Sequence, residues 1–131
     1  MTAIYGLLGE HLSHSYSKQI HEALAGYTYD LIELTKEGVK DFMTAKEFSA
    51  VNITIPYKTE VIPYLDIIDD RAKKIGAVNT VVNKNGLLTG YNTDYFGFKR
   101  MLERAGIEGA AKKCLVLGSG GSSKTVVCVL K

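Results

Sequence analysis

The sequence predicts an α/β fold, in which a mostly parallel but mixed sheet is flanked by helices and a second α/β unit begins near the C-terminus. Three observations predict this class. Short runs of apolar and β-branched residues alternate with segments of helical periodicity, as in layered folds with parallel strands. An Asn-Gly pair at 85–86 separates two such runs, which indicates one antiparallel hairpin. A final apolar run leads into a glycine-rich turn and a further helix.

The first half of the chain contains three predicted strands and two predicted helices. The strands cover residues 4–9, 27–34 and 50–55, the last ended by Pro56. The first helix is expected to begin at Ser17, whose hydroxyl can cap it, and to stop at Gly26. Its apolar positions on one face are Ile20, Ala23 and Leu24. Thr35 is a suitable cap for a second helix that continues to about Met43.

The second half begins with two short predicted helices, at 57–65 and 68–75, the second capped by Asp69 or Asp70. A hairpin follows, because a two-residue Asn-Gly turn favours the positive φ angles that a type I′ turn needs. Its strands cover residues 78–83 and 87–91. A long helix then starts at Asn92 or Thr93 and ends at Gly106. The final predicted elements are a linker at 107–113, a strand at 114–117, a glycine turn and a helix.

The length, composition and charge of the chain limit the classes of protein to which it can belong. The chain has 131 residues, enough for one compact domain with a core and too few for two complete ones. Hydrophobic residues make up 46% and charged residues 23%, an ordinary globular balance. The formal net charge is +2, with Lys and Arg scattered along the chain. Because nucleic-acid binders gather basic residues on one face, we expect no nucleic-acid partner.

The cysteines and the N-terminus indicate a reducing compartment. Cys114 and Cys128 lie in apolar stretches, so we expect both to be small buried core residues. Neither has a Cys or His nearby at metal-ligand spacing, and we therefore expect no metal site. The N-terminus lacks the order of a signal peptide, and no apolar run is long enough to span a membrane. We expect a cytoplasmic protein without a membrane partner.

The segment LVLGSGGSSKTVV carries the pattern of a nucleotide-binding loop. A short apolar run precedes Gly118, Gly120 and Gly121, and a helix follows. Glycines let backbone amides approach a pyrophosphate, and the helix N-terminus attracts its negative charge. Ser123 stands where the Rossmann fingerprint has Gly or Ala. The residue that would read the cofactor ribose, about twenty positions further on, is expected beyond Lys131.

Four small polar clusters lie at predicted strand ends or helix starts. They are Ser15-Tyr16-Ser17, Asn52-Ile53-Thr54 with Lys58 just after it, Gly76 to Thr80, and Asn92-Thr93-Asp94. Each alone has a structural explanation, as a helix cap, an edge-strand residue or a surface charge. In an open α/β sheet, however, ligands bind beyond the carboxyl ends of the strands. Hydroxyls, amides, one ammonium and one carboxylate converging there would suit a small polyhydroxylated acid.

Taken in order, these segments resemble the shikimate dehydrogenase family: SHSYS followed by IH, then VNITIPYK, GAVNT, GYNTD and LGSGG. The resemblance covers essentially the whole chain. It implies that Ser15 and Ser17 hold the shikimate carboxylate, that Thr54, Asn79 and Asp94 bond its ring hydroxyls, and that Lys58 and Asp94 form the catalytic pair. It also implies NADP as cofactor, bound at Gly118, Ser119, Gly120, Gly121 and Ser122. The family commonly has proline where this chain has Lys18, which alters the helix start without removing the serines.

The resemblance predicts an oxidoreductase that reduces 3-dehydroshikimate to shikimate, as a monomer or homodimer. Residues 1–106 would form the substrate domain and 107–131 the start of a truncated Rossmann domain. Beside a carboxylate, Lys58 would stay an ammonium, suited to donate a proton and stabilise alkoxide charge.

Two alternatives stay open. The chain could be a non-catalytic module that binds shikimate without a nicotinamide pocket, or its parent enzyme could also accept quinate. Relatives that accept quinate tend to carry threonine at the position of Ser17, which favours shikimate here. We further expect the chain to be part of a longer protein, since one strand and one helix cannot bury both faces of a dinucleotide domain. The strand at 114–117 should therefore be disordered, docked on the first domain or swapped into a partner.

Overall fold

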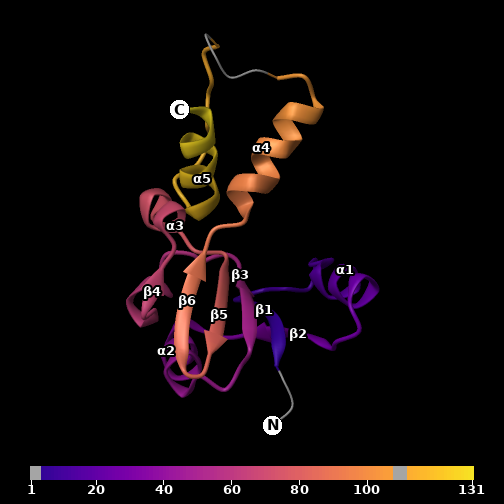
Figure 1. The fold of residues 1–131 in the computed structure, drawn as a ribbon, viewed down its shortest axis with the longest axis vertical. Helices are drawn as coiled ribbons and strands as arrows, with labels where there is room; N and C mark the ends of the chain where they lie inside the picture. Colours follow the sequence, from indigo (N-terminus) through magenta and orange to yellow (C-terminus); the bar gives the residue numbers. More distant parts are fainter. Residues whose placement is uncertain (1–3, 108–111) are drawn as a thin grey trace.

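The computed structural model describes residues 4–107 and 112–131. Six strands form one sheet in the order β2-β1-β3-β5-β6-β4, with helices around it (Figure 1). The strands are β1 (Tyr5–Gly9), β2 (Tyr29–Glu33), β3 (Ala50–Ile53), β4 (Ile67–Ile68), β5 (Thr80–Lys84) and β6 (Leu87–Tyr91). The mixed, mostly parallel sheet predicted from the sequence is confirmed, and the two-residue β4 is an addition to it.

One strand of the sheet runs against the others. β1 pairs in parallel with β2 and β3, and β4 pairs in parallel with β6. β5 lies between β3 and β6 and is antiparallel to both. The start of β5 therefore lies at the same edge of the sheet as the ends of β1, β3 and β6. This arrangement brings four sequence segments to one edge.

The helices are α1 (Ser17–Leu24), α2 (Lys36–Ala45), α3 (Asp70–Ile75), α4 (Asp94–Arg104) and α5 (Gly121–Leu130), with a 3₁₀ turn η1 (Ile62–Tyr64). Asp69 caps α3 as predicted, because its carboxylate accepts hydrogen bonds from the N–H groups of Arg71 and Ala72. Thr93 occupies the N-cap position of α4, but the cap bond comes from Asn92, whose Oδ1 accepts from Tyr95 N–H at 3.1 Å. In Figure 1, α4 and α5 lie together at one end of the molecule, beyond the sheet.

The predicted hairpin is confirmed. β5 and β6 pair with Lys84 opposite Leu87, and the turn residues Asn85 and Gly86 have φ angles of 56° and 83°. Asn83 Oδ1 also accepts a hydrogen bond of 2.8 Å from Gly86 N–H, which closes the turn.

The main core joins the sheet to α2 and α3. Its members are fully or almost fully buried: Leu8, Val39, Met43, Phe48, Val51, Ile53, Tyr57, Val61, Ala72, Val78, Val81 and Leu88. Alternate residues of the strands supply one face, and Val39 and Met43 supply one side of α2. The buried Tyr57 hydroxyl donates to the Leu34 carbonyl at 2.6 Å, so the core leaves this polar group paired.

Two predicted elements are wrong. The helix expected at 57–65 is a series of turns followed by η1, because Pro63 lacks the N–H that an α-helix needs there. The strand expected at 114–117 does not form, and residues 112–119 have no regular structure. A strand needs a neighbouring backbone, and the described residues provide none beside this segment. Leu115 and Leu117 are 84% and 86% exposed, so of the three alternatives given for this segment, docking on the first domain is wrong.

Two further expectations are wrong, the burial of the cysteines and the capping of α1, and the apolar positions of α1 turn out to be exposed. Cys114 is exposed and Cys128 is partly buried, so neither is a core residue. The apolar face of α1 lies toward solvent, with Ile20 54% and Leu24 82% exposed. Ser17 is the first residue of α1 rather than its cap, and Tyr16 occupies the cap position without a side-chain bond.

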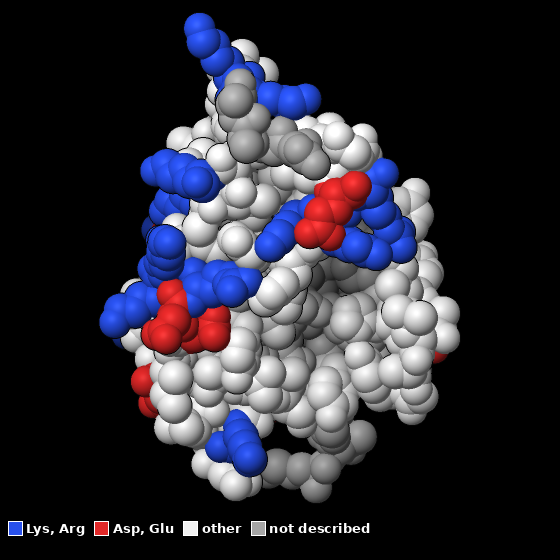
Figure 2. All heavy atoms as spheres, turned by 45° about the horizontal axis from the view of Figure 1, so that its top comes forward, with Lys and Arg blue, Asp and Glu red and all other residues white. Residues whose placement is uncertain are grey.

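The surface shows no single charged face in the view of Figure 2, where basic side chains form separate groups and acidic side chains lie beside several of them. Within residues 4–107 and 112–131, no helix combines the length and the apolar character needed to cross a membrane.

Candidate functional site

A polar pocket of about 270 Å³ lies at the sheet edge where the ends of β1 and β3 meet the start of β5 and of α4. Its lining residues are Leu7, Ser17, His21, Asn52, Ile53, Thr54, Lys58, Asn79 and Asp94. They come from β1, α1, β3 with the turn that follows it, and the segments that precede β5 and begin α4. The reversed direction of β5 places Asn79 here, since this residue comes just before that strand.

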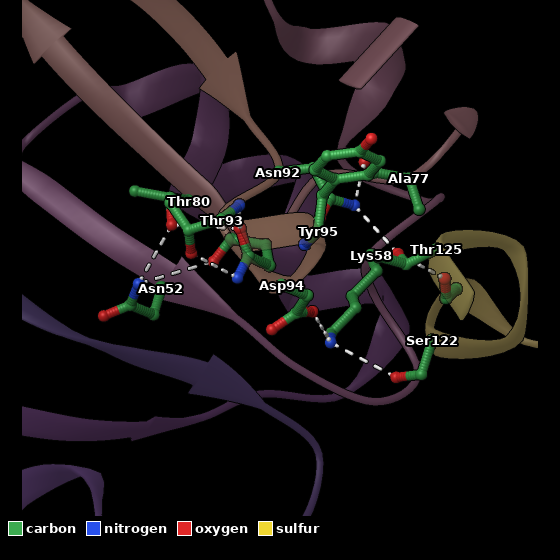
Figure 3. Close-up of polar contacts among 12 residues, drawn as sticks. Asn52, Lys58, Ala77, Thr80, Asn92, Thr93, Asp94, Tyr95, Ser122 and Thr125 are labelled. Atoms are coloured by element: carbon green, nitrogen blue, oxygen red, sulfur yellow. Dashed lines mark hydrogen bonds and ion pairs between the residues drawn. The ribbon is translucent and has the colours of Figure 1, made fainter. Parts of the chain in front are cut away.

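An ion pair lies in this pocket. Lys58 Nζ is 2.6 Å from Asp94 Oδ2, and the lysine side chain is only 13% exposed while the aspartate is 39% exposed (Figure 3). The backbone of Lys58 is fixed as well, because its carbonyl accepts from Val78 N–H at 2.8 Å. Partial burial lowers the screening between the two charges. The pocket thus presents a positioned ammonium group with the aspartate as its counter-ion.

Amide and hydroxyl side chains form a network beside the ion pair (Figure 3). Asn79 is 8% exposed, and its side chain bonds Thr93 twice: Nδ2 donates to the hydroxyl at 2.8 Å and Oδ1 accepts from the N–H at 2.8 Å. Asn52 Nδ2 donates to the Thr80 hydroxyl at 3.1 Å. The Tyr29 hydroxyl donates to Asn52 Oδ1 at 2.6 Å. Burial raises the pKa of Tyr29 well above its ordinary value, so this hydroxyl keeps its proton.

The α1 side of the pocket carries Ser17 and His21, one helical turn apart. Ser15 Oγ accepts a hydrogen bond of 3.2 Å from Ser17 N–H, which supports the start of α1. Ser15 itself does not line the pocket. The His21 ring stacks on Tyr29, with ring centroids 4.0 Å apart and planes 12° from parallel, and its Nδ1 lies 2.8 Å from the Tyr27 hydroxyl oxygen.

A second pocket of about 280 Å³ joins the glycine loop to Lys58. Ser119, Gly120, Gly121 and Ser122 line it on the loop side. Position 118 has a φ angle of 123°, which favours glycine. Gly118 borders a different hollow, lined by residues of α3 and α5. A Cβ atom at Gly121 would come within 2.9 Å of Lys58 Cβ, so glycine is what lets α5 begin this close to the ion pair.

The loop has properties that suit a cofactor phosphate. The N-cap residue of α5 is Gly120, and no side chain caps the helix. The first N–H groups of α5 are therefore left for a ligand, as at nucleotide-binding helix starts. Ser122 Oγ lies 3.4 Å from Lys58 Nζ, which places this loop directly beside the ion pair.

A buried asparagine connects the pocket side of the molecule to α5. Asn92 is 3% exposed and its Nδ2 donates to the Ala77 carbonyl at 3.0 Å and to the Thr125 hydroxyl at 3.1 Å. Thr125 is 2% exposed and its hydroxyl donates to the Gly121 carbonyl at 3.1 Å. Figure 3 shows Asn92 between Ala77 and Thr125, so the first turn of α5 is tied to the segments that carry the pocket.

The structure brings together most of the predicted site. Five predicted substrate residues line one pocket, namely Ser17, Thr54, Lys58, Asn79 and Asp94. Ser15 does not line this pocket, and its hydroxyl oxygen accepts a hydrogen bond from Ser17 N–H. Two polar lining residues were absent from the predicted set: Asn52, which belongs to the VNITIPYK segment, and His21, which is four residues after Ser17. Helical spacing could have indicated His21, because positions i and i+4 share one face.

Comparison with known proteins gives consistent matches. The family model described as the shikimate dehydrogenase substrate binding domain matches residues 7–81. A curated shikimate dehydrogenase (NADP(+)) from Halothermothrix orenii is 45% identical, with 98% of this chain and 48% of that protein covered. A crystal structure of shikimate dehydrogenase 1 from Peptoclostridium difficile is 40% identical with a TM-score of 0.94, covering 98% of this chain and 51% of that one.

A further solved structure is the shikimate 5-dehydrogenase from Thermus thermophilus in complex with shikimate. It is 34% identical with a TM-score of 0.87, covering 98% of this chain and 52% of that one. The chain spans about half the length of the curated relatives it matches.

Proposed function

This chain belongs to the shikimate dehydrogenase family, and we propose that it carries the substrate pocket of an NADP-dependent enzyme that interconverts 3-dehydroshikimate and shikimate. The observation that carries the proposal is the ion pair of Lys58 and Asp94, 2.6 Å apart, within a pocket otherwise lined mainly by hydroxyl, amide and imidazole groups. In this proposal residues 1–106 form the substrate-binding domain and residues 107–131 begin the cofactor-binding domain.

The lining groups suit a small acid with several hydroxyls. Ser17, supported by Ser15, would bind the carboxylate at the α1 end of the pocket. Thr54, Asn79 and Asp94 would bond the ring hydroxyls. Hydroxyl and amide groups can both donate and accept, which matches the dual character of an alcohol.

The proposed reaction places a hydride on the carbonyl carbon and a proton on its oxygen. A nicotinamide cofactor, when bound, supplies the hydride. The Lys58 ammonium stabilises the negative charge that develops on the oxygen and gives it the proton that completes the alcohol. Asp94 holds the ammonium in place and accepts a substrate hydroxyl bond. In the oxidative direction the neutral amine takes the proton back.

The glycine loop would hold the cofactor phosphates through Gly118, Ser119, Gly120, Gly121 and Ser122. Four of these residues line the pocket that adjoins Lys58. The uncapped start of α5 supports the assignment, because its N–H groups favour an anion.

Lys58→Met tests the catalytic role. We expect kcat for NADPH-dependent reduction of 3-dehydroshikimate to fall by about 10²–10⁴-fold, with a smaller change in KM, because the proton donor is lost. Lys84→Met is the matched control: this exposed lysine lies at the hairpin end of β5, and its replacement should leave both constants unchanged. A variant at Lys58 with normal kcat and raised KM would contradict the catalytic role and leave only substrate binding.

A non-catalytic binding module is the second candidate, because every residue that lines the polar pocket precedes the glycine loop in the chain. Mass spectrometry of the 131-residue chain, with the same assay and a shikimate titration, separates the two. Turnover by the verified chain excludes the module, whereas binding without turnover supports it. Comparing kcat/KM for shikimate and quinate tests the broader specificity, which Ser17 disfavours.

A further inference from the structure

The α1 end of the substrate pocket contains a side chain that the proposed mechanism does not use. His21 lines this pocket together with Ser17, and its ring is half-buried. The two residues are four positions apart on α1, so they share one face of the helix. A ligand group bound by Ser17 therefore lies beside the helix face that also carries His21.

The fixed charges that line the pocket are already paired with one another. A ligand carboxylate therefore has to be bound by other hydrogen-bond donors. Lys58 and Asp94 are the lining residues with fixed charges, and they neutralise one another at 2.6 Å. The ammonium is thus already bound to a carboxylate. A second carboxylate, on the substrate, would compete with Asp94 if it sat beside Lys58. It is better accommodated beside α1, where the lining donors are hydroxyl and imidazole groups.

The His21 ring is held in a defined orientation. It stacks on Tyr29 at a centroid distance of 4.0 Å, and its Nδ1 lies 2.8 Å from the Tyr27 hydroxyl oxygen. Tyr27 packs in turn on Tyr5, with centroids 4.6 Å apart. When the Tyr27 hydroxyl donates to Nδ1, the neutral ring carries its proton on Nε2. That N–H is the ring donor left for a ligand.

We propose that His21 binds the carboxylate of the substrate through Nε2–H, beside the Ser17 hydroxyl, and so selects acids over their uncharged analogues. Tyr27 is a positioning residue in this scheme, because it fixes the tautomer and orientation of the ring without touching the ligand. The inference rests on the proposed shikimate pocket and adds to it a specificity residue. A hydrogen bond to a charged group is stronger than one to a neutral group, so the effect should depend on the charge of the ligand.

Calorimetric titration of the 131-residue chain with shikimate and with its methyl ester tests the proposal. His21→Phe keeps an aromatic ring for stacking on Tyr29 and removes both nitrogens. We expect it to weaken binding of the acid by about tenfold or more while the ester changes little, so that the preference for the acid collapses. Tyr27→Phe should shift the same preference in the same direction by a smaller factor.

Three controls keep the outcome interpretable. His14→Phe replaces an exposed histidine outside the pocket and should bind both ligands as the unsubstituted chain does. His21→Gln restores an N–H donor and should recover part of the preference. Urea denaturation of each variant shows whether the fold is retained.

Equal weakening of acid and ester by His21→Phe, or no change in either, would overturn the assignment of His21 while leaving the proposed function intact. If the unsubstituted chain binds neither ligand, the proposed function fails, and the role of His21 fails with it.

Discussion

Lys58 is held by contacts from three separate segments of the chain. Val78 N–H bonds its carbonyl, Asp94 binds its ammonium, and Gly121 at the start of α5 packs against its aliphatic stem. A free lysine side chain has many rotamers, and fixing it costs roughly 1.5–2 kcal/mol of conformational entropy. Because the contacts from Asp94 and Gly121 restrict the side chain, the position of the ammonium depends on α5 as well as on the pocket.

Gly121→Ala tests that dependence. The added Cβ would lie 2.9 Å from Lys58 Cβ and 3.2 Å from Lys58 Cδ, too close for either to stay in place. We expect the free energy of unfolding, measured in urea, to fall by about 1–3 kcal/mol, as for other overpacked sites. Gly97→Ala in α4 is the control, since a Cβ there meets nothing within 4 Å and alanine favours a helix by up to about 1 kcal/mol. If Gly121→Ala left the free energy of unfolding unchanged, α5 would not be packed tightly against Lys58.

At the residue scale, the sequence indicated most of the pocket because several polar clusters occur together at strand ends and helix starts, although each alone has a structural explanation. Thr54, Asn79 and Asp94 all come from such positions and all line it. Ser15 and Ser17 could not be told apart, because which hydroxyl faces the pocket depends on where α1 begins. His21 was missed because a half-buried histidine in an amphipathic helix looks like a packing residue until the pocket is seen.

Among the elements, the hairpin is attached to the end of α2 by one carboxylate. Asp66 Oδ2 accepts from Leu88 N–H at 2.8 Å and from Lys46 Nζ at 2.9 Å, and Lys46 Nζ also donates to the Gly86 carbonyl at 2.7 Å. Asn83 Nδ2 donates to the Lys46 carbonyl at 2.8 Å. The hydrogen bond from Leu88 N–H is the main reason why the pKa of the Asp66 carboxyl group is lowered, and the bond from Lys46 lowers this pKa further.

The lowered pKa of Asp66 has a defined consequence for acid stability. Because the folded value lies below the unfolded value of about 3.9, the stabilisation is present above about pH 4 and is lost as the pH falls through the folded value. We expect Asp66→Asn to lower stability at pH 7 and to reduce the fall in stability between about pH 5 and pH 2. Asp41→Asn, at an exposed site on α2, should change neither. Urea denaturation at each pH provides the measurement. If the free energy of unfolding fell equally with pH in the native chain and in Asp66→Asn, the prediction would be contradicted.

Helix starts and turns could be predicted from the sequence where interactions between neighbouring residues determine them. Asn85-Gly86 and the Asp69 cap act within a few residues, so the turn and the start of α3 followed from the sequence. The run at 114–117 has the composition of a strand, but strand formation depends on a partner backbone that composition does not reveal. In the same way, the amphipathic pattern of α1 shows which face of the helix is apolar but does not reveal whether another element covers that face.

At the scale of the whole molecule, the two most exposed large apolar side chains among the described residues lie in the segment before α5. Leu115 and Leu117 are 84% and 86% exposed, whereas Leu88 is fully buried. We expect the double substitution Leu115→Ser and Leu117→Ser to leave the free energy of unfolding unchanged and to reduce self-association, measured by sedimentation velocity. Leu88→Ala, as the buried control, should cost about 2–5 kcal/mol. A comparable loss from the double substitution would mean that this segment packs on the rest of the protein.

The bridge from Asn92 to Thr125 bears on how separable the two predicted domains are. Asn92 precedes the boundary expected near Gly106 and Thr125 follows it, yet both are buried and bonded to one another. Anyone who transplants the pocket into another scaffold, or who divides the chain for segmental labelling, would remove the bond from Asn92 to Thr125 by cutting at that boundary. A fragment that keeps this bond must therefore extend at least to Thr125, beyond the boundary proposed near Gly106.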